Sequence, residues 1–229
     1  MKNFFSKLIL FWSEDRSLTV MLLLLLLFIF VFVPILSLGK GGQIFIKIIY
    51  SILLLTGILS VAKHKTYVIA ASMLAVIGLF LNWLAQVKPL SQVLIANDFS
   101  VILFSLFFAV LVLIKTFQPG DITFHRIEGS IVVYLFMGLV FAFTFHAIYL
   151  IEGSSSFNNI RDRDIKEFLY FSFTSLTTMG YGDITPVNSL ARSFANLEGL
   201  VGQLYPAILI ARLVSMEFES SSRRKKKND

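Results

Sequence analysis

The sequence contains no cysteine, which excludes disulfide bonds and thiolate metal sites. Its three histidines are dispersed, and it has no phosphate-binding loop and no cluster of metal-ligand residue types. We therefore expect neither an enzyme nor a bound cofactor. Charged residues make up only 15% of the 229 residues, whereas 56% are hydrophobic, and the mean hydropathy is +0.80. Soluble domains do not have this composition, so the sequence indicates an integral membrane protein.

Long apolar stretches predict an all-α fold with six transmembrane helices. The stretches cover about residues 18–37, 44–62, 67–87, 98–117, 127–151 and 189–215. Basic residues gather in alternate connections and at the C-terminal end: Lys2, Lys7, Arg16, Lys63, Lys65, Lys115, Arg126 and Arg223 to Lys227. The positive-inside rule then places both termini in the cytoplasm, and we expect a multi-pass protein of the cell membrane.

A shorter apolar segment lies between the last two predicted spans. It runs from Asp164 to Thr177, and Glu167 follows Asp164 at the spacing of a capping box. A helix of about 13 residues is roughly 20 Å long, too short to cross a bilayer. The segment is therefore expected to be re-entrant. Its C-terminal end, the negative end of the helix dipole, would then point to the membrane centre, where it favours a cation.

Residues 177–183, Thr-Thr-Met-Gly-Tyr-Gly-Asp, directly follow this segment. The motif resembles the selectivity filter of potassium channels, in which four TVGYG-type loops present rings of backbone carbonyls to a dehydrated ion. Met179 stands where the common form has valine, and the resemblance covers about residues 127–216. It implies a filter formed by Thr178, Met179, Gly180, Tyr181 and Gly182, with potassium at the first four of these.

Each filter position suits the role that the resemblance implies. Gly180 and Gly182 permit the positive φ that turns consecutive carbonyls toward one axis. The Thr178 hydroxyl would close the innermost cage, and the Tyr181 ring would pack behind the filter. A ring of Asp183 carboxylates at the outer mouth would raise the local cation concentration. The alternative, a tight surface turn, is disfavoured because irregular backbone at membrane depth must be buried or line a water-filled path.

Only one such motif occurs, and no internal repeat is evident. Four loops are needed for carbonyl rings, so the resemblance implies a homotetramer around a central pore. We divide the chain into an interfacial helix, a peripheral four-helix unit, a linker, a pore domain and a basic tail, at residues 1–17, 18–117, 118–126, 127–216 and 217–229. The tail is expected to meet anionic lipid, and a nucleic-acid partner is not expected.

The peripheral unit departs from voltage-gated channels in its fourth helix. The stretch 98–117 has no arginine ladder, and Lys115 lies at its cytoplasmic end. Moving one charge through 100 mV is worth about 2.3 kcal/mol, so an uncharged helix couples weakly to the field. We expect weak intrinsic voltage dependence. Two interpretations of the unit stay open, a structural support for the pore and a ligand-binding module.

The last predicted helix contains residues that could gate a pore. Gly199 and Gly202 precede Pro206, an arrangement that suits either a hinge or close helix packing. Gln203, Pro206 and Ile210 share one helical stripe, which we place on the pore axis.

Two ionisable residues within predicted spans have competing interpretations. Glu198 is an acid within a predicted span, which suggests either a functional site or a hydrogen bond to Ser172 or Ser175 from behind the filter. His146 in the fifth span is either a hydrogen-bonded packing residue or a pH sensor. The sequence as a whole favours a potassium-selective channel. A nonselective cation channel and a non-conducting scaffold subunit are the alternatives.

Overall fold

A computed structural model of the protein describes residues 16–32, 40–60, 65–117 and 124–228. Almost all of the predicted interfacial helix and most of the predicted linker, residues 118–123, lie outside these ranges. The longer elements are the helices α2 (Arg16–Leu27), α4 (Lys40–Ser60), α5 (Lys65–Val87), α6 (Ser91–Thr116), α7 (Phe124–Glu152), α8 (Ile165–Leu176) and α9 (Ser189–Asn228). A π-helical segment, η1 (Phe28–Phe32), continues α2, and a 3-10 turn, η3 (Ser154–Ser156), follows α7.

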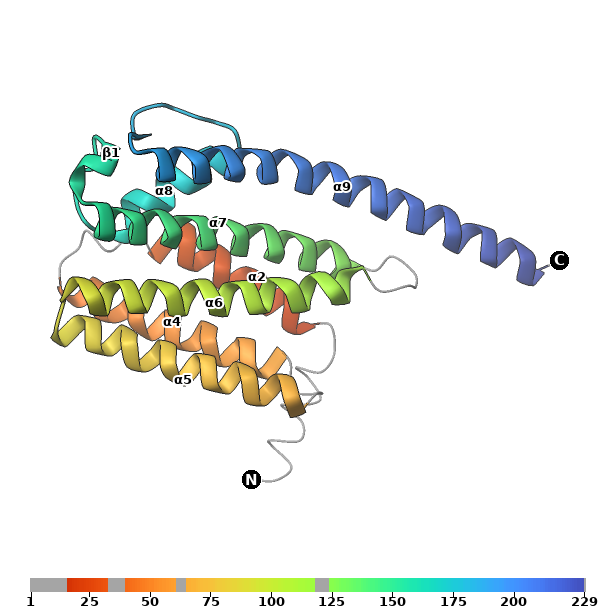
Figure 1. Ribbon diagram of the computed structural model, residues 1–229. Helices are drawn as coiled ribbons and strands as arrows, with labels where there is room; N and C mark the ends of the chain where they lie inside the picture. Colours follow the sequence, from red (N-terminus) through yellow and green to blue (C-terminus); the bar gives the residue numbers. More distant parts are fainter. Residues whose placement is uncertain (1–15, 33–39, 61–64, 118–123, 229) are drawn as a thin grey trace, which may run out of the picture.

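The long helices lie side by side in a bundle (Figure 1). The most extensive helix–helix contact in the described part of the chain joins α6 to α7. The peripheral unit therefore packs against the pore segment of its own chain. The short helix α8 contacts both α7 and α9, and α9 runs far beyond the other helices toward the C-terminus (Figure 1).

Four of the described helices are long and apolar enough to cross a membrane, which supports a multi-pass, all-α membrane protein. The spans are Thr66–Val87, Ser91–Thr116, Phe124–Glu152 and Ser189–Phe218. The described apolar parts of the first two helices, Leu18–Val31 and Ile48–Ile58, are shorter. Six spans therefore remain a prediction. Two-residue strands, β1 (Phe157–Asn158) and β2 (Thr185–Pro186), pair antiparallel beside the loop that precedes α9.

Two helix boundaries differ from the sequence prediction. The fourth helix begins at Ser91 rather than near residue 98, because the apolar pattern that continues upstream is stopped only by Pro89. Asp98 consequently lies two turns inside α6, where its exposed fraction is 1%. The last helix continues through the predicted tail to Asn228, since that stretch contains neither glycine nor proline and is rich in helix-forming Lys and Arg.

Phenylalanine dominates the packing around α8. One buried cluster fills the space between α2, α4, α6 and α7. A second cluster joins α7, α8 and β1, where the rings of Phe145 and Phe171 lie 4.9 Å apart and those of Phe157 and Phe168 lie 5.6 Å apart. Both pairs are edge-to-face, the geometry that aromatic quadrupoles prefer. This cluster fixes the position of α8, and with it the loop that follows.

Candidate functional site

The helix α8 begins where the sequence predicted, at Asp164 in the N-cap position. Asp164 has extended backbone (φ −77°, ψ 143°), and the Glu167 N–H donates to its carbonyl at 3.2 Å. The predicted capping box is wrong in its side-chain part, because the Asp164 side chain makes no cap hydrogen bond. Its carboxylate lies 3.7 Å from Lys166 Nζ instead. This exposed ion pair therefore competes with the cap hydrogen bond for the Asp164 side chain.

The loop after α8 has an unusual backbone. Positive φ values fall on every second residue, 59° at Thr178, 53° at Gly180 and 77° at Gly182. In an ordinary strand successive peptide units face opposite ways. When φ is positive at every second residue, successive carbonyls can instead face the same side of the chain. A β-branched residue with positive φ is an outlier that costs about 1–3 kcal/mol, so the surroundings must hold Thr178 in place.

Backbone hydrogen bonds tie the start of this loop to the end of α8. The Thr178 N–H donates to Ser175 O at 3.0 Å, and the Gly180 N–H donates to Thr174 O at 3.1 Å. The Thr177 hydroxyl donates to Phe173 O at 2.6 Å. The strained turn at Thr178 is therefore anchored on both sides by the last turn of the helix.

In the single chain the filter motif is exposed. The side chains of Met179 and Tyr181 have exposed fractions of 63% and 65%. The Tyr181 ring stacks on Tyr170, with the ring planes 4° apart and the centroids 6.3 Å apart. The loop thus leaves a large apolar and aromatic surface uncovered beside α8.

Three groups hold Asp183 at the end of the motif. The Tyr170 hydroxyl donates to Asp183 Oδ2 at 2.8 Å, and the Ile184 N–H donates to Oδ1 at 3.0 Å. Asn159 Nδ2 donates to the Asp183 carbonyl at 2.8 Å. The Tyr170 hydrogen bond is the main reason why the pKa of Asp183 lies below its ordinary value. Sequence reasoning missed Tyr170 and Asn159, because only the fold brings them to this loop.

The inner end of α8 rests on α7 and α9. The Tyr134 hydroxyl donates to Leu176 O at 3.0 Å, and Tyr134 stacks on Tyr205 with centroids 5.9 Å apart. Tyr205 in turn donates to Ser130 O at 2.9 Å. A Cβ at Gly202 would overlap the Leu176 carbonyl group, so this glycine permits close packing of α9 beneath α8. Nothing lies within 4 Å of a Cβ placed at Gly199.

The buried acid Glu198 joins three helices. Its exposed fraction is 0%, and its Oε1 lies 2.5 Å from Ser172 Oγ on α8. The same hydroxyl lies 2.8 Å from Gly138 O on α7. Of the two hydroxyls named from the sequence, Ser172 makes the contact, whereas the Ser175 carbonyl accepts from the filter loop. Gly138 leaves room for the Phe173 ring, whose Cζ lies 2.5 Å from the position of a Cβ.

The gate candidates lie along α9. In the single chain Gln203 and Ile210 are exposed, and Pro206 is half-buried within a helix that continues past it. Farther along, Arg126 Nη1 of α7 approaches Met216 Sδ at 3.9 Å. One face of α9 is therefore free for another chain or for a pore, while its other face holds α8.

His146 of α7 lies away from the filter. Its Nε2 is 3.0 Å from Arg163 O, and its Nδ1 is 2.8 Å from Asp98 Oδ2 on α6. The side chain is buried and connects the peripheral unit to the residue that precedes the N-cap of α8. Sequence reasoning did not identify Asp98 as its neighbour, because the predicted start of α6 placed this acid at a helix end.

Comparison with known proteins agrees with this geometry. Residues 130–219 match the family described as ion channel. The chain is 37% identical over 93 residues to the voltage-gated potassium channel Kch of Escherichia coli (strain K12), over 40% of this chain and 20% of that protein. It is 36% identical over 78 residues to Protein LctB of Geobacillus stearothermophilus, over 34% of this chain and 54% of the relative. For Protein LctB of Bacillus caldotenax the identity is 35% over 88 residues, covering 35% and 64%.

The chain thus spans less than two thirds of the length of each of these relatives. No solved structure matches it at a significant level. The matched segment contains most of α7, the whole of α8 with its loop, and most of α9. Residues 130–219 of this multi-pass membrane protein therefore match the ion channel family and are similar to a protein named as a voltage-gated potassium channel.

Proposed function

We propose that the protein is a potassium-selective channel that conducts passively through a homotetrameric pore. The observation that carries the proposal is the alternation of positive φ at Thr178, Gly180 and Gly182. Carbonyls that face one side are what a filter needs to replace the hydration shell of an ion. The carbonyls of Thr178 to Tyr181 would bind potassium, and the Thr178 hydroxyl would close the innermost cage.

The tetramer follows from the coordination chemistry. One loop supplies one side of each carbonyl cage, so four copies must surround the axis. The exposure of Met179 and Tyr181 supports this, because apolar and aromatic side chains at membrane depth need a neighbour. In the assembly these side chains would pack behind the filter against the adjacent subunits.

Residues around the loop would keep it in register. Asp183, held by Tyr170 and Asn159, would form the acidic outer mouth. Glu198 would brace α8 from behind through Ser172. Gln203 would line the cavity below the filter, and the stripe through Pro206 and Ile210, with Gly199 and Gly202 upstream, would form the gate region.

We propose that this channel is not gated by voltage through its fourth helix. The helix α6 has no arginine, and its basic residue Lys115 lies in the last turn. The long contact between α6 and α7 supports a fixed peripheral unit. The acid inside this helix, Asp98, is held against His146 of α7, and a helix without basic residues inside the field gains little energy from moving through it.

Orientation and surroundings are also proposals. The distribution of Lys and Arg in the sequence places both termini in the cytoplasm and the filter toward the outside of the cell membrane. The basic segment from Arg223 to Lys227 would then lie near anionic lipid headgroups. No nucleic-acid partner and no cofactor besides permeant potassium is proposed.

Ion flux into liposomes that contain the purified full chain tests the proposal. With a potassium gradient, we expect rapid uptake of rubidium tracer that potassium competes away and sodium does not. Equal competition by sodium would favour a nonselective cation channel. No flux above that of protein-free liposomes, in a preparation that is folded and tetrameric, would favour a non-conducting scaffold.

A further inference from the structure

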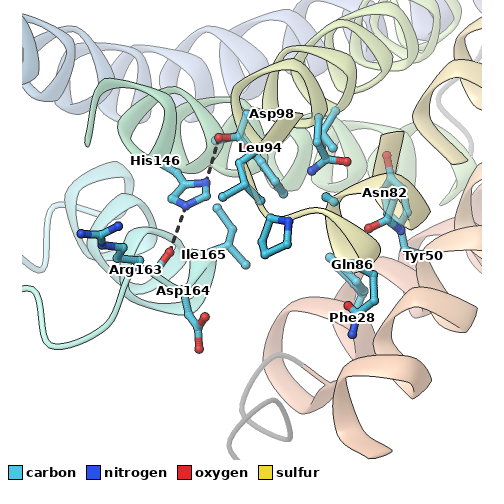
Figure 2. Close-up of a pocket in the computed structure, with 15 residues that line it drawn as sticks. Phe28, Tyr50, Asn82, Gln86, Leu94, Asp98, His146, Arg163, Asp164 and Ile165 are labelled. Atoms are coloured by element: carbon cyan, nitrogen blue, oxygen red, sulfur yellow. Dashed lines mark hydrogen bonds and ion pairs between the residues drawn. The ribbon is translucent and has the colours of Figure 1, made fainter. Parts of the chain in front are cut away.

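A cavity of about 370 Å³ lies between the peripheral unit and the start of α8 (Figure 2). Its wall is formed by α4, α5, α6, α7 and the segment Arg163 to Ile165. Pro89 and Leu94, at the beginning of α6, also line it, so the cavity is near the end of the bundle that carries the filter loop. Its volume is in the range of small-molecule sites. No role in the pore proposed above uses this space.

Unpaired buried polar atoms concentrate in this cavity. Among the described residues, the lining atoms that are buried without a hydrogen-bond partner are Tyr50 Oη, Asn97 Oδ1, Asp98 Oδ2 and His146 Nδ1. Two of these atoms, Asp98 Oδ2 and His146 Nδ1, lie 2.8 Å apart and form an ion-pair contact with each other, so Tyr50 Oη and Asn97 Oδ1 are the ones left without any partner in the described part of the chain. Leaving such groups unpaired costs about 1–3 kcal/mol each, so a polar guest would stabilise this site.

The polar atoms of the wall around Asp98 are mostly acceptors. His146 Nε2 faces the Arg163 carbonyl at 3.0 Å, and because a carbonyl only accepts, Nε2 carries the hydrogen. Asn97 Oδ1 and the lone pairs of the Asp98 carboxylate that do not face His146 are acceptors, whereas the Tyr50 hydroxyl can donate or accept. A guest with several donors therefore suits Asn97 and Asp98. A primary ammonium group has three N–H donors and no acceptor.

The charge and the walls of the cavity agree with such a guest. The Asp98 carboxylate is almost fully buried, so its attraction for a cation is poorly screened. Asp164 also lines the cavity, and Figure 2 shows the guanidinium of Arg163 turned away from it. Apolar and aromatic side chains line another part of the wall, among them Phe28, Leu94, Val101 and Phe143, and the amides of Asn82 and Gln86 line it as well. Aromatic faces also attract cations.

We propose that this cavity is a binding site for a small primary amine with a compact apolar body. The ammonium group would lie against Asp98 and Asn97, and the apolar body would lie against Phe28 and Phe143. Such a ligand would touch α6, α7 and the start of α8 together, so it would couple the peripheral unit to the helix that carries the filter. Binding at this site does not depend on the ion selectivity of the pore.

Ligand-induced thermal stabilisation of the full chain in detergent tests the site, with 2-phenylethylamine as probe and 2-phenylethanol as its neutral counterpart. We expect the protonated amine to raise the unfolding temperature saturably and the alcohol to bind much more weakly. Asp98→Asn should weaken the amine about 10- to 100-fold, the effect of losing a hydrogen bond to a charged group. Asp162→Asn is the matched control, because Asp162 is an exposed acid that pairs with Lys166 outside the cavity.

A second variant covers the case in which Asp98→Asn fails to fold. Leu94→Trp fills the cavity without removing a charge and should abolish saturable binding. Equal affinity for amine and alcohol, or wild-type affinity in folded Asp98→Asn or Leu94→Trp protein, would overturn the proposal. So would the absence of saturable binding, which would mean that the contact with His146 already satisfies Asp98.

Discussion

At the residue scale, the filter loop depends on a few positions that tolerate no ordinary substitute. Thr178 holds a positive φ although it is β-branched, and the last turn of α8 anchors it through backbone hydrogen bonds. Gly202 lets α9 pass directly beneath the carbonyl of Leu176. The strained backbone at Thr178 and the close packing at Gly202 therefore position the same loop, and each of them can be tested separately.

Substituting Gly202 by alanine should destabilise the protein. The new Cβ would overlap backbone atoms of Leu176, which cannot rotate away, so we expect a loss of about 1–3 kcal/mol. Gly199→Ala is the matched control, because its Cβ meets open space in the chain and should be neutral or slightly stabilising. Thermal unfolding of both variants in detergent measures the difference. Equal unfolding temperatures would show that α9 does not pack this closely.

Removing the Tyr170 hydroxyl should raise the pKa of Asp183. The hydrogen bond favours the carboxylate, so its contribution to stability is present above the ordinary pKa of an aspartate and is lost as the pH falls through the lowered value. In Tyr170→Phe that contribution should be absent, and Asp183 should titrate at a higher pH than in the wild type. NMR titration of Asp183, or external proton block of potassium current, reports the midpoint. A midpoint unchanged from wild type would show that the Tyr170 hydroxyl does not lower the pKa of Asp183.

At the scale of elements, α8 is positioned by its neighbours rather than by its own length. Tyr134 of α7 binds its last carbonyl, Glu198 of α9 binds Ser172, and the phenylalanine cluster covers its outer half. Each neighbour acts on a different turn of the same short helix. The position of the loop that follows α8 is therefore set by α7 and α9 together with β1.

Breaking the contact between Ser172 and Glu198 should loosen α8. Ser172→Ala leaves a fully buried carboxyl group without its partner, which should cost about 1–3 kcal/mol. Glu198→Gln keeps the size and an acceptor oxygen, so it should be milder than Ser172→Ala. Glu217→Gln, at an exposed acid on the same helix, should behave as wild type. Thermal unfolding and the potassium-to-sodium flux ratio would both follow this order, and a reversed order would contradict the role of Ser172.

The sequence predicted the elements that depend on local patterns. The short helix, its N-cap at Asp164 and the long apolar helices follow from spacing and composition, whereas the loop with its glycines was expected from the resemblance of residues 177–183 to the potassium-channel motif. It did not predict the pairs Asp98–His146, Tyr170–Asp183 and Tyr134–Leu176, because each joins parts of the chain that only tertiary packing brings together. The capping box failed for a related reason, since Lys166 competes for the Asp164 carboxylate.

At the scale of the whole molecule, the pore segment and the peripheral unit pack as one body within a chain. The contact between α6 and α7 runs along both helices, and His146 adds a buried polar contact near one end. The exposed motif and the exposed face of α9 leave the surfaces on which copies of the chain would meet. The tetramer, on this account, is built on α8 and α9, with the peripheral units outside.

Channel opening should depend weakly on voltage. The helix α6 has no basic residue before its last turn, and its one acid, Asp98, is held against His146 of α7, so the activation curve should lack the steepness that several charges per subunit produce. Recordings from planar bilayers over a range of about 200 mV would measure the slope. A steep slope equivalent to several gating charges per subunit would show that another element senses the field. A shallow slope alone fits the account, since ions in the filter also move through the field.

The central claim is that Thr178 to Gly182 selects potassium, with Met179 in place of valine behind the filter. The most direct test is the reversal potential of the wild-type protein in bilayers with potassium and sodium on opposite sides. The account predicts a reversal potential that moves by about 59 mV for each tenfold change in potassium, the value for one monovalent charge. It also predicts that replacing potassium by sodium on one side shifts the potential strongly. A reversal potential that stays near zero after this exchange would contradict potassium selectivity.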